Sequence, residues 1–323
     1  ESVQRMVSGF LSPSVEAASS DASVQATLES HDYRIDADAK LGHDDDKSAF
    51  LENAHETLDA RYETFNHYLA EDDWDLFFGV FMTTDRVNHF LFGDYANDTD
   101  DAAGFLEFYR ALDEYIGRLY DSLPEDVSLV IASDHGFTEL RHEVHCNAWL
   151  AEEGYLTYDT DEPESLADLG ADTEVFSLIP GRFFVNLEGR EANGSVSEGE
   201  YETVRDRLVD DLTAMTGPDG DPVCADVYLG EDVFDGPAAD IAPDVVAVPA
   251  DGFDLKAGFS GSKPVFGEGP RNGMHKFSNA TLVTDDDRIA VDDVDLYDLT
   301  PTLLDLLEID VDADFDGRSL MRA

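Results

Sequence analysis

Hydrophobic residues in the first part of the chain recur at helical spacing and alternate with short apolar runs. Residues 48–69 carry apolar side chains three and four positions apart, which predicts an amphipathic helix. Residues 74–82 are almost continuously apolar and predict a buried strand, and a second helix is expected over residues 102–123. A run rich in β-branched residues at 127–132 predicts another buried strand. Helix, strand, helix and strand in this order are typical of a parallel α/β sheet.

The middle of the chain is less regular. Residues 137–156 predict a loop that leads into a short helix, and the acidic residues 159–173 predict a surface excursion. A strand is expected at residues 183–187, and a helix at residues 200–215 with Ser197 as its N-cap. These elements predict a mixed α+β region rather than a continued α/β alternation.

The last part of the chain returns to regular signals. Strands are expected at residues 245–248 and 280–284, on either side of a loop at 258–273 that holds five glycines and two prolines. A helix is expected to begin with Thr300 as N-cap and Pro301 at the first helical position.

Together the elements predict an α/β fold with a mostly parallel central sheet and helices on both faces. We expect a single domain over residues 1–323, with an irregular α+β cap or insertion at about residues 140–240. The sequence shows no internal repeat and no clear linker.

The charge is unusual for a chain with such a regular apolar pattern. There are 73 acidic and 20 basic residues, a net charge of −53, and only five of the basic residues are lysines. This composition indicates adaptation to very high salt, where the Debye length falls to about 3 Å or less and self-repulsion is screened. An acidic protein that binds cations diffusely is the alternative. Either way, nucleic acids and anionic membranes are excluded as expected partners because they carry the same sign of charge.

Cysteine content and hydropathy indicate a cytoplasmic protein. The two cysteines, Cys146 and Cys224, are too few for a disulfide framework and fit a reducing compartment. No apolar run reaches the length of a membrane span, and no signal peptide is visible. The chain opens with Glu1 and reads like the middle of a domain, so export is not excluded by this observation.

Candidate metal ligands follow the predicted strands. Ser133-Asp134-His135-Gly136 lies just beyond the strand at 127–132, where ligand sites of α/β sheets are found, although Asp-His pairs also occur in ordinary turns. Asp85 and His89 follow the run at 74–82 and are four apart, so a helical turn places both on one face. His275 closes the glycine-rich loop. Two Asp and three His form the mixed N/O donor set that Zn or Mn accepts.

The order of these motifs resembles the alkaline phosphatase superfamily, and most closely its type I phosphodiesterase/nucleotide pyrophosphatase branch. The similarity runs from about Met6 through nearly the whole chain. The matching segments are Thr84-Asp-Arg-Val-Asn-His-Phe90, Ser133-Asp-His-Gly-Phe137, Asn186-Leu-Glu-Gly-Arg190, Gly273-Met-His275 and Asp298-Leu-Thr-Pro-Thr-Leu-Leu with Asp316-Gly-Arg-Ser-Leu320.

The resemblance implies an alkaline phosphatase-like fold and a two-metal site. Asp85, His89 and His275 would hold one divalent ion, and Asp134 with His135 would hold the second. The expected ion is Zn, with Mn as the alternative. The family completes the second metal with an Asp and uses a Thr or Ser nucleophile, both from a segment expected upstream of residue 1, so no catalytic nucleophile is expected within the chain. Three neighbours of the ligands are candidates for substrate contact: Arg86, Asn272 and Lys276.

The activity implied by the resemblance is hydrolysis of phosphodiesters or nucleotide-like phosphate esters, with a small-molecule phosphate ester as substrate and in-line displacement at phosphorus. Sulfate-ester or phosphonate hydrolysis and phosphomutase activity are alternatives within the superfamily. A catalytically inactive fragment that serves as a scaffold or binding protein is an alternative of another class. The oligomeric state is not predicted.

Three further motifs have simpler explanations. Asp312-x-Asp314-x-Asp316 copies the start of an EF-hand loop, but the twelfth position is Ala323, so a turn is expected. His142 and His145 follow the Asp134-His135 pair and are more typical of loop histidines than of extra ligands. Three Asn-x-Ser/Thr triplets, at residues 97, 193 and 279, match glycosylation acceptors that arise often by chance.

Overall fold

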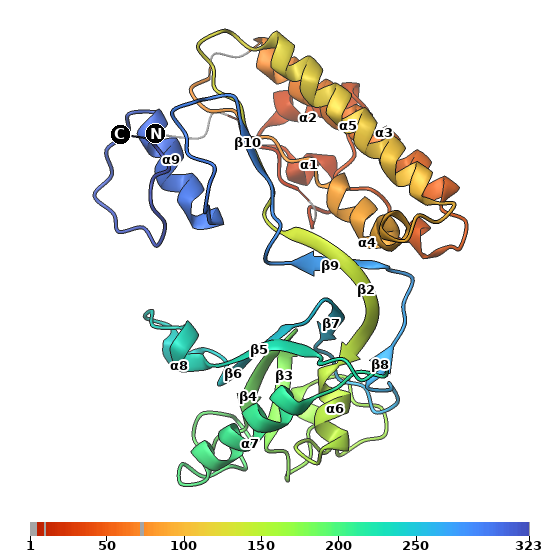
Figure 1. The fold of residues 1–323 in the computed structure, drawn as a ribbon, viewed down its shortest axis with the longest axis vertical. Helices are drawn as coiled ribbons and strands as arrows, with labels where there is room; N and C mark the ends of the chain where they lie inside the picture. Colours follow the sequence, from red (N-terminus) through yellow and green to blue (C-terminus); the bar gives the residue numbers. More distant parts are fainter. Residues whose placement is uncertain (1–4, 10, 72–73, 323) are drawn as a thin grey trace. The chain divides into compact units, whose positions relative to one another are not determined.

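The computed structural model describes residues 5–9, 11–71 and 74–322. The chain forms two compact units (Figure 1). Unit 1 comprises Glu1–Thr138 together with His275–Ala323, and unit 2 comprises Glu139–Met274. The predicted organisation, a single domain with a cap or insertion at about residues 140–240, is not tested by this division into two units and stays a prediction. Every helix of the described ranges is too short or too polar to cross a lipid bilayer.

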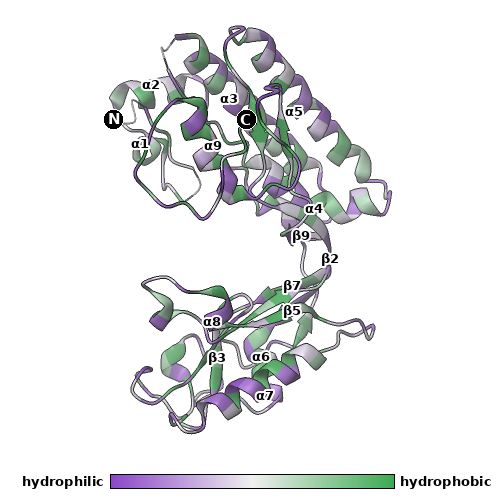
Figure 2. Ribbon diagram, turned by 60° about the vertical axis from the view of Figure 1, so that its left-hand side comes forward, coloured by the Kyte–Doolittle hydropathy of each residue, from purple (hydrophilic) through white to green (hydrophobic). Residues whose placement is uncertain are grey.

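Three long helices build the core of unit 1: α3 (Ser48–Glu71), α4 (Thr83–Ala96) and α5 (Ala102–Ser122). Two of them match the helices predicted from apolar periodicity, and α5 is hydrophilic on one side and hydrophobic on the other (Figure 2). Their apolar faces meet in one cluster, made by Phe50, Ala54, Leu58, Val87, Phe90, Leu91, Phe105, Phe108 and Leu112. The remaining helical elements of this unit are α1 (Val15–Ala18), α2 (Ala22–Ser30), η1 (Leu41–His43), η4 (Leu296–Asp298) and α9 (Leu299–Leu306).

The described strand pair within unit 1 is β1 (Val130–Ala132) with β10 (Leu282–Thr284), which run antiparallel. Both strands fall inside predicted ones. The prediction of a buried strand over residues 74–82 is wrong, because these residues, all of which the structure describes, form no strand. Phe77 and Phe81 pack against Phe65 of α3, with ring centroids 5.6 and 5.0 Å away. The opposite face is exposed, and Phe78 retains 78% of its accessible surface.

Most of the strands lie wholly or partly in unit 2. One sheet has the order β7 (Gly252–Lys256), β2 (Gly136–His145), β8 (Phe266–Gly267), and β9 (Gly273–Lys276) also pairs with β2. The other has the order β3 (Val175–Ile179), β4 (Arg182–Val185), β6 (Val245–Pro249), β5 (Cys224–Leu229). The helical elements are α6 (Cys146–Glu152), η2 (Leu166–Asp168), α7 (Tyr201–Ala214), α8 (Gly230–Val233) and η3 (Ala239–Ile241).

The strand directions do not confirm a mostly parallel sheet. Antiparallel pairs dominate the described residues, with β2 and β7 as a parallel pair. The connection between β3 and β4 shows the physical reason. It is the two-residue turn Pro180-Gly181, in which Gly181 has a φ of 68°, and such a short turn joins only antiparallel strands.

Element boundaries differ from the prediction at three places. Residues 137–145, predicted as a loop, form most of the ten-residue strand β2. Helix α7 is preceded by Glu200 rather than Ser197 at its N-cap position, and α9 begins at Leu299 with Asp298 as N-cap, so Pro301 is the third helical residue. Both helices start within a few residues of the predicted positions, because apolar periodicity locates a helix better than it locates the ends of the helix.

An ion pair with a buried carboxylate stabilises unit 2 and explains the predicted motif at residues 186–190. Both guanidinium nitrogens Nη1 and Nη2 of Arg190 donate to the Asp244 carboxylate, at 2.8 and 2.6 Å. The Tyr201 hydroxyl and the Val185 amide donate to the same carboxylate, each at 2.6 Å. Asn186 at the start of the motif is buried and donates to the Thr173 carbonyl at 2.8 Å. These contacts give the motif a structural role within unit 2.

Candidate metal centre

Helix α4 carries the first two predicted ligands. Asp85 lies in its first turn and His89 one turn later, so both side chains emerge on the same face, as their spacing predicted. His89 Nε2 lies 3.5 Å from Asp85 Oδ1. His89 is buried and Asp85 is half-buried.

Strand β9 brings His275 to the same carboxylate from 190 positions further along the chain. His275 Nε2 lies 3.0 Å from Asp85 Oδ1. The ligand atoms of Asp85, His89 and His275 all lie within 4.8 Å of one another. Zn–N and Zn–O bonds of about 2.0–2.2 Å separate neighbouring donors of one tetrahedral ion by roughly 3–4 Å, so the spacing of this group is close to that of the donors of a single ion.

His135 lies at the edge of this group. Its Nε2 atom is 3.9 Å from Asp85 Oδ1, and its ring stacks on His275 with centroids 3.8 Å apart. Its Nδ1 atom lies 3.2 Å from the Gly136 carbonyl, which can only accept, so a neutral ring carries its proton on Nδ1 and leaves Nε2 free to bind an ion. Asp134 Oδ2 is 3.6 Å from His135 Nε2, and its side chain is 78% exposed. The predicted pair Asp134 and His135 therefore lies directly beside the Asp85 group.

Phe137 forms an aromatic support for the three imidazoles. Its ring centroid lies 5.1 Å from those of His89 and His275 and 5.4 Å from that of His135. Edge contacts of this kind restrict how far each imidazole can rotate. The sequence placed Phe137 next to the ligands but did not indicate this role.

Gly136 is required by close packing rather than by a sharp turn. A Cβ atom at this position would lie 1.6 Å from Asn279 Oδ1 and 2.7 Å from the Ser278 carbonyl oxygen. Asn279 in turn donates from Nδ2 to the Phe137 carbonyl at 2.9 Å. Glycine thus lets the segment after His275 lie directly against the segment that carries His135.

Arg86 holds the ligand carboxylate in place. Its Nη1 donates to Asp85 Oδ2 at 2.8 Å, while its Nε and Nη2 donate to Asp36 Oδ2 at 2.9 and 2.7 Å. The predicted contact between Arg86 and substrate stays a prediction, since these bonds already give the side chain a positioning role. Asp36 was missed by the sequence analysis, and no local signal marks it.

The other two candidates for substrate contact, Lys276 and Asn272, belong to different units. Lys276 ends β9 in unit 1 and is half-buried. Asn272 belongs to unit 2, where its carbonyl accepts from the Leu140 amide at 2.8 Å. Their contact with substrate stays a prediction.

The electrostatics favour an ionised Asp85. Burial by itself would raise the pKa of this carboxyl, but the hydrogen bond with His275 and the electrostatic attraction of His89 and Arg86 outweigh it and lower the pKa below its usual value. Tyr109 of α5 also contacts α4, where Asn88 Nδ2 donates to its hydroxyl at 2.7 Å. Burial, followed by the nearby Asp85 charge, raises the pKa of Tyr109, so it stays protonated.

The remaining histidine candidates lie elsewhere. His142 and His145 belong to unit 2, where His142 lies 3.6 Å from Asp219 and His145 Nδ1 lies 2.9 Å from the Pro264 carbonyl. The Asp312-x-Asp314-x-Asp316 segment forms an exposed, irregular stretch. It is followed by Gly317, where a Cβ atom would lie 2.2 Å from the Tyr297 carbonyl oxygen.

The chemistry of the donor set therefore agrees with a divalent metal. One carboxylate and two imidazoles meet at one point, with a third imidazole beside them, and this combination suits Zn or Mn better than Ca or Mg, which prefer oxygen ligands.

Comparison with known proteins also supports a metal-dependent enzyme. The profile of a family described as "Type I phosphodiesterase / nucleotide pyrophosphatase" matches residues 5–278. This range includes all five predicted metal ligands. A search of the curated proteins found no match. The family is one of metal-dependent hydrolases, and its profile covers most of the chain. The chain therefore belongs to the type I phosphodiesterase/nucleotide pyrophosphatase family of phosphodiesterase-type enzymes.

Proposed function

We propose that the chain hydrolyses phosphodiesters or nucleotide-like phosphate esters at a centre in which Asp85, His89 and His275 bind a divalent metal ion. The observation that supports this most directly is the meeting of these three side chains within 4.8 Å, from segments far apart in the sequence. The family match supports phosphate esters as substrates over sulfate esters or phosphonates.

A second divalent ion, held by Asp134 and His135, is the further part of this proposal. The exposed Asp134 carboxylate and the Nε2 atom of His135 offer two donors next to the first group. Zn, with Mn as the alternative, fits the mixed nitrogen and oxygen ligands at both places. Divalent ions bound here would act as Lewis acids toward the phosphoryl oxygens.

The chain's own residues prepare the centre for such a substrate. Asp85 is kept ionised by His275, His89 and Arg86, and Arg86 is itself fixed by Asp36. Phe137 and Gly136 hold the imidazoles and the backbone beneath them. With the geometry preset, less reorganisation is needed when charge develops on the transferred group.

The remaining parts of the proposal concern the setting of the enzyme. We infer a salt-adapted, cytoplasmic protein from the net charge of −53 and the two cysteines. This inference is not needed for the metal centre itself.

The test is metal analysis together with hydrolysis of an aryl phosphodiester by the full-length protein. We expect about two Zn or Mn ions per chain, and His275→Ala should lower metal affinity and hydrolysis by about 100-fold or more, because it removes a ligand. His67→Ala is the matched control, since His67 lies on α3 and pairs with Glu71 at 3.2 Å. Full metal content and activity in His275→Ala would contradict the proposal.

A further inference from the structure

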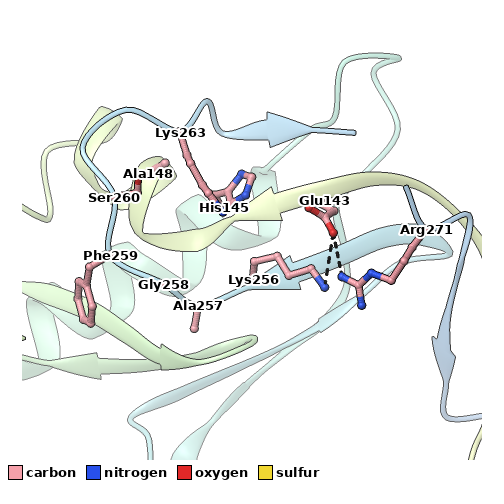
Figure 3. Close-up of a pocket in the computed structure, with 10 residues that line it drawn as sticks. All are labelled: Glu143, His145, Ala148, Lys256, Ala257, Gly258, Phe259, Ser260, Lys263 and Arg271. Carbon is pink, nitrogen blue, oxygen red and sulfur yellow. Dashed lines mark hydrogen bonds and ion pairs between the residues drawn. The ribbon is translucent and has the colours of Figure 1, made fainter. Parts of the chain in front are cut away.

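Unit 2 contains a pocket of about 280 Å³ that the metal centre does not use (Figure 3). It lies between the end of β2, the end of β7 and the loop that follows β7. The residues that line it are Glu143, His145, Ala148, Lys256, Ala257, Gly258, Phe259, Ser260, Lys263 and Arg271.

The lining is rich in positive charge in a chain that has little of it. Three cationic side chains, Lys256, Lys263 and Arg271, line the pocket together with one carboxylate, Glu143. The chain has only five lysines and a net charge of −53, and two of those lysines lie in this pocket. In so acidic a protein, such a local excess of cations opposes the overall field and marks a place where an anion can approach.

Carboxylates hold two of the cations at the pocket wall. Arg271 Nη2 lies 2.8 Å from Glu143 Oε1, and Lys256 Nζ lies 3.9 Å from the same oxygen (Figure 3). Asp254 pairs with Lys256 and lies 3.6 Å from Arg271. Burial by itself would raise the pKa of Glu143, but the hydrogen bond from Arg271 and the charges of Lys256 and Arg271 lower it, so Glu143 remains ionised. The two cations are thereby positioned, and each keeps N–H donors beyond these bonds.

Lys263 supplies charge that the unit does not neutralise. Among the described residues, no carboxylate lies within ion-pair distance of its ammonium group. It lines the pocket beside His145, whose Nδ1 atom lies 2.9 Å from the Pro264 carbonyl. That carbonyl can only accept, so it fixes the ring by a hydrogen bond from Nδ1.

The rest of the wall is small and apolar. Ala148, Ala257 and Gly258 leave room, and Phe259 provides an aromatic surface. Ligand pockets commonly combine such a wall with a few convergent polar groups, and the volume is at the lower end of their range. The pocket is therefore suited to a compact ligand with one strongly anionic group.

We propose that this pocket binds the phosphate group of a small molecule, at a site separate from the metal centre. A doubly charged phosphate matches a lining with three cationic side chains better than a singly charged carboxylate does, and guanidinium and ammonium groups are the usual partners of phosphate oxygens. The ligand is either inorganic phosphate or a compact phosphate ester whose body lies against Phe259.

The experiment is a calorimetric titration of the full-length protein after metal removal with EDTA, so that the metal centre contributes no phosphate binding. The probes are inorganic phosphate, phenyl phosphate and benzoate at one fixed KCl concentration. We expect saturable millimolar or tighter binding of phosphate, and weaker binding of benzoate because it carries one charge. Phenyl phosphate binding more tightly than phosphate would identify an ester as the ligand, and equal binding would identify the free ion.

Two single substitutions test whether phosphate binds in this pocket. Lys263→Gln should weaken phosphate binding by about fivefold, as expected for the loss of one solvent-accessible charge contact. Lys40→Gln is the matched control, because Lys40 is an exposed lysine of unit 1. Circular dichroism of each variant checks that it is folded. The proposal is overturned if the EDTA-treated protein shows no saturable phosphate binding, if benzoate binds as well as phenyl phosphate, or if Lys263→Gln binds like Lys40→Gln.

Discussion

At the scale of single residues, Arg190 and Asp244 show how a predicted functional motif can have a structural purpose. Asp244 is buried, and its two oxygens accept four hydrogen bonds, from Arg190, Tyr201 and Val185. The hydrogen bonds with Asp244 raise the pKa of Arg190 still further, so its guanidinium group stays charged. A buried carboxylate of this kind depends on its cation, because water cannot replace it.

We therefore predict that Arg190→Ala lowers the free energy of unfolding by about 3 kcal/mol, since it leaves Asp244 buried without a counter-charge. Urea denaturation followed by circular dichroism measures the change. Arg118→Ala is the control, because Arg118 pairs with Glu114 on the exposed side of α5, so its loss should change the free energy of unfolding far less. An equal effect of the two substitutions would contradict the structural role given to the Arg190 pair.

Single residues also show what the sequence could reveal about the metal centre. The four-residue spacing of Asp85 and His89 is local, and the structure confirms that both side chains lie on one face of α4. The contact of Arg86 with Asp36, 50 positions earlier, has no local signal. The sequence also did not show that His135 stacks on His275, because that contact depends on how two distant segments pack.

At the scale of elements, helices were predicted better than strands. The periodicity of residues 48–69 and 102–123 is a property of each segment alone, and α3 and α5 agree with it closely. A strand is defined by its neighbours. The apolar run at 74–82 packs one face on Phe65, but no strand among the described residues pairs with it, so Phe78 stays exposed.

Strand β2 shows the opposite error. Its charged residues Arg141, His142 and Glu143 made the segment resemble a loop. In the structure these side chains have distant partners: Arg141 pairs with Asp221 at 3.1 Å, and Glu143 pairs with Arg271 at 2.8 Å. Ion pairs formed across 80 and 128 positions are not visible in a local pattern of apolar residues.

The C-terminal element suggests a second stability prediction. Asp298, before α9, accepts at Oδ1 from the Arg318 amide at 2.8 Å and at Oδ2 from the Asp295 amide at 3.0 Å. Thr302 of α9 accepts from the Leu320 amide at 2.9 Å. The predicted motif at residues 298–304 and 316–320 therefore closes the chain end onto α9.

We predict that Asp298→Asn lowers the free energy of unfolding by about 2 kcal/mol at pH 7, because an amide nitrogen replaces one accepting oxygen. The hydrogen bonds from Arg318 and Asp295 lower the pKa of Asp298 below its usual value. Its stabilising effect is thus present above the unfolded-state pKa of about 3.9 and is lost as pH falls through the lower folded-state pKa. The measurement is chemical denaturation of both proteins at several pH values.

The expected signature is a difference between the wild type and Asp298→Asn that is largest near neutral pH and shrinks below about pH 4. Asp305→Asn is the control, since Asp305 lies on α9 with its side chain exposed. A difference that stays constant with pH would show that Asp298 acts by packing rather than through its charge.

At the scale of the whole molecule, the dominant feature is a charge of −53 distributed over a chain with well-packed apolar clusters. Cations are placed selectively: Arg86 at the metal centre, Arg190 at the buried Asp244 carboxylate, and Lys256, Lys263 and Arg271 at the pocket. The acidic groups therefore repel one another over most of the surface, and the strength of this repulsion depends on the ions in solution.

We predict that the thermal midpoint of unfolding rises steeply with KCl between about 0.1 M and about 1 M, because the Debye length falls from about 10 Å to about 3 Å over this range. Folding brings the carboxylates closer together, so screening stabilises the folded state more than the unfolded chain. Sucrose at matching osmolality is the control, since it strengthens apolar burial without screening charge. If sucrose raises the midpoint as much as KCl does, preferential exclusion accounts for the effect and the charge-based explanation of salt adaptation is wrong.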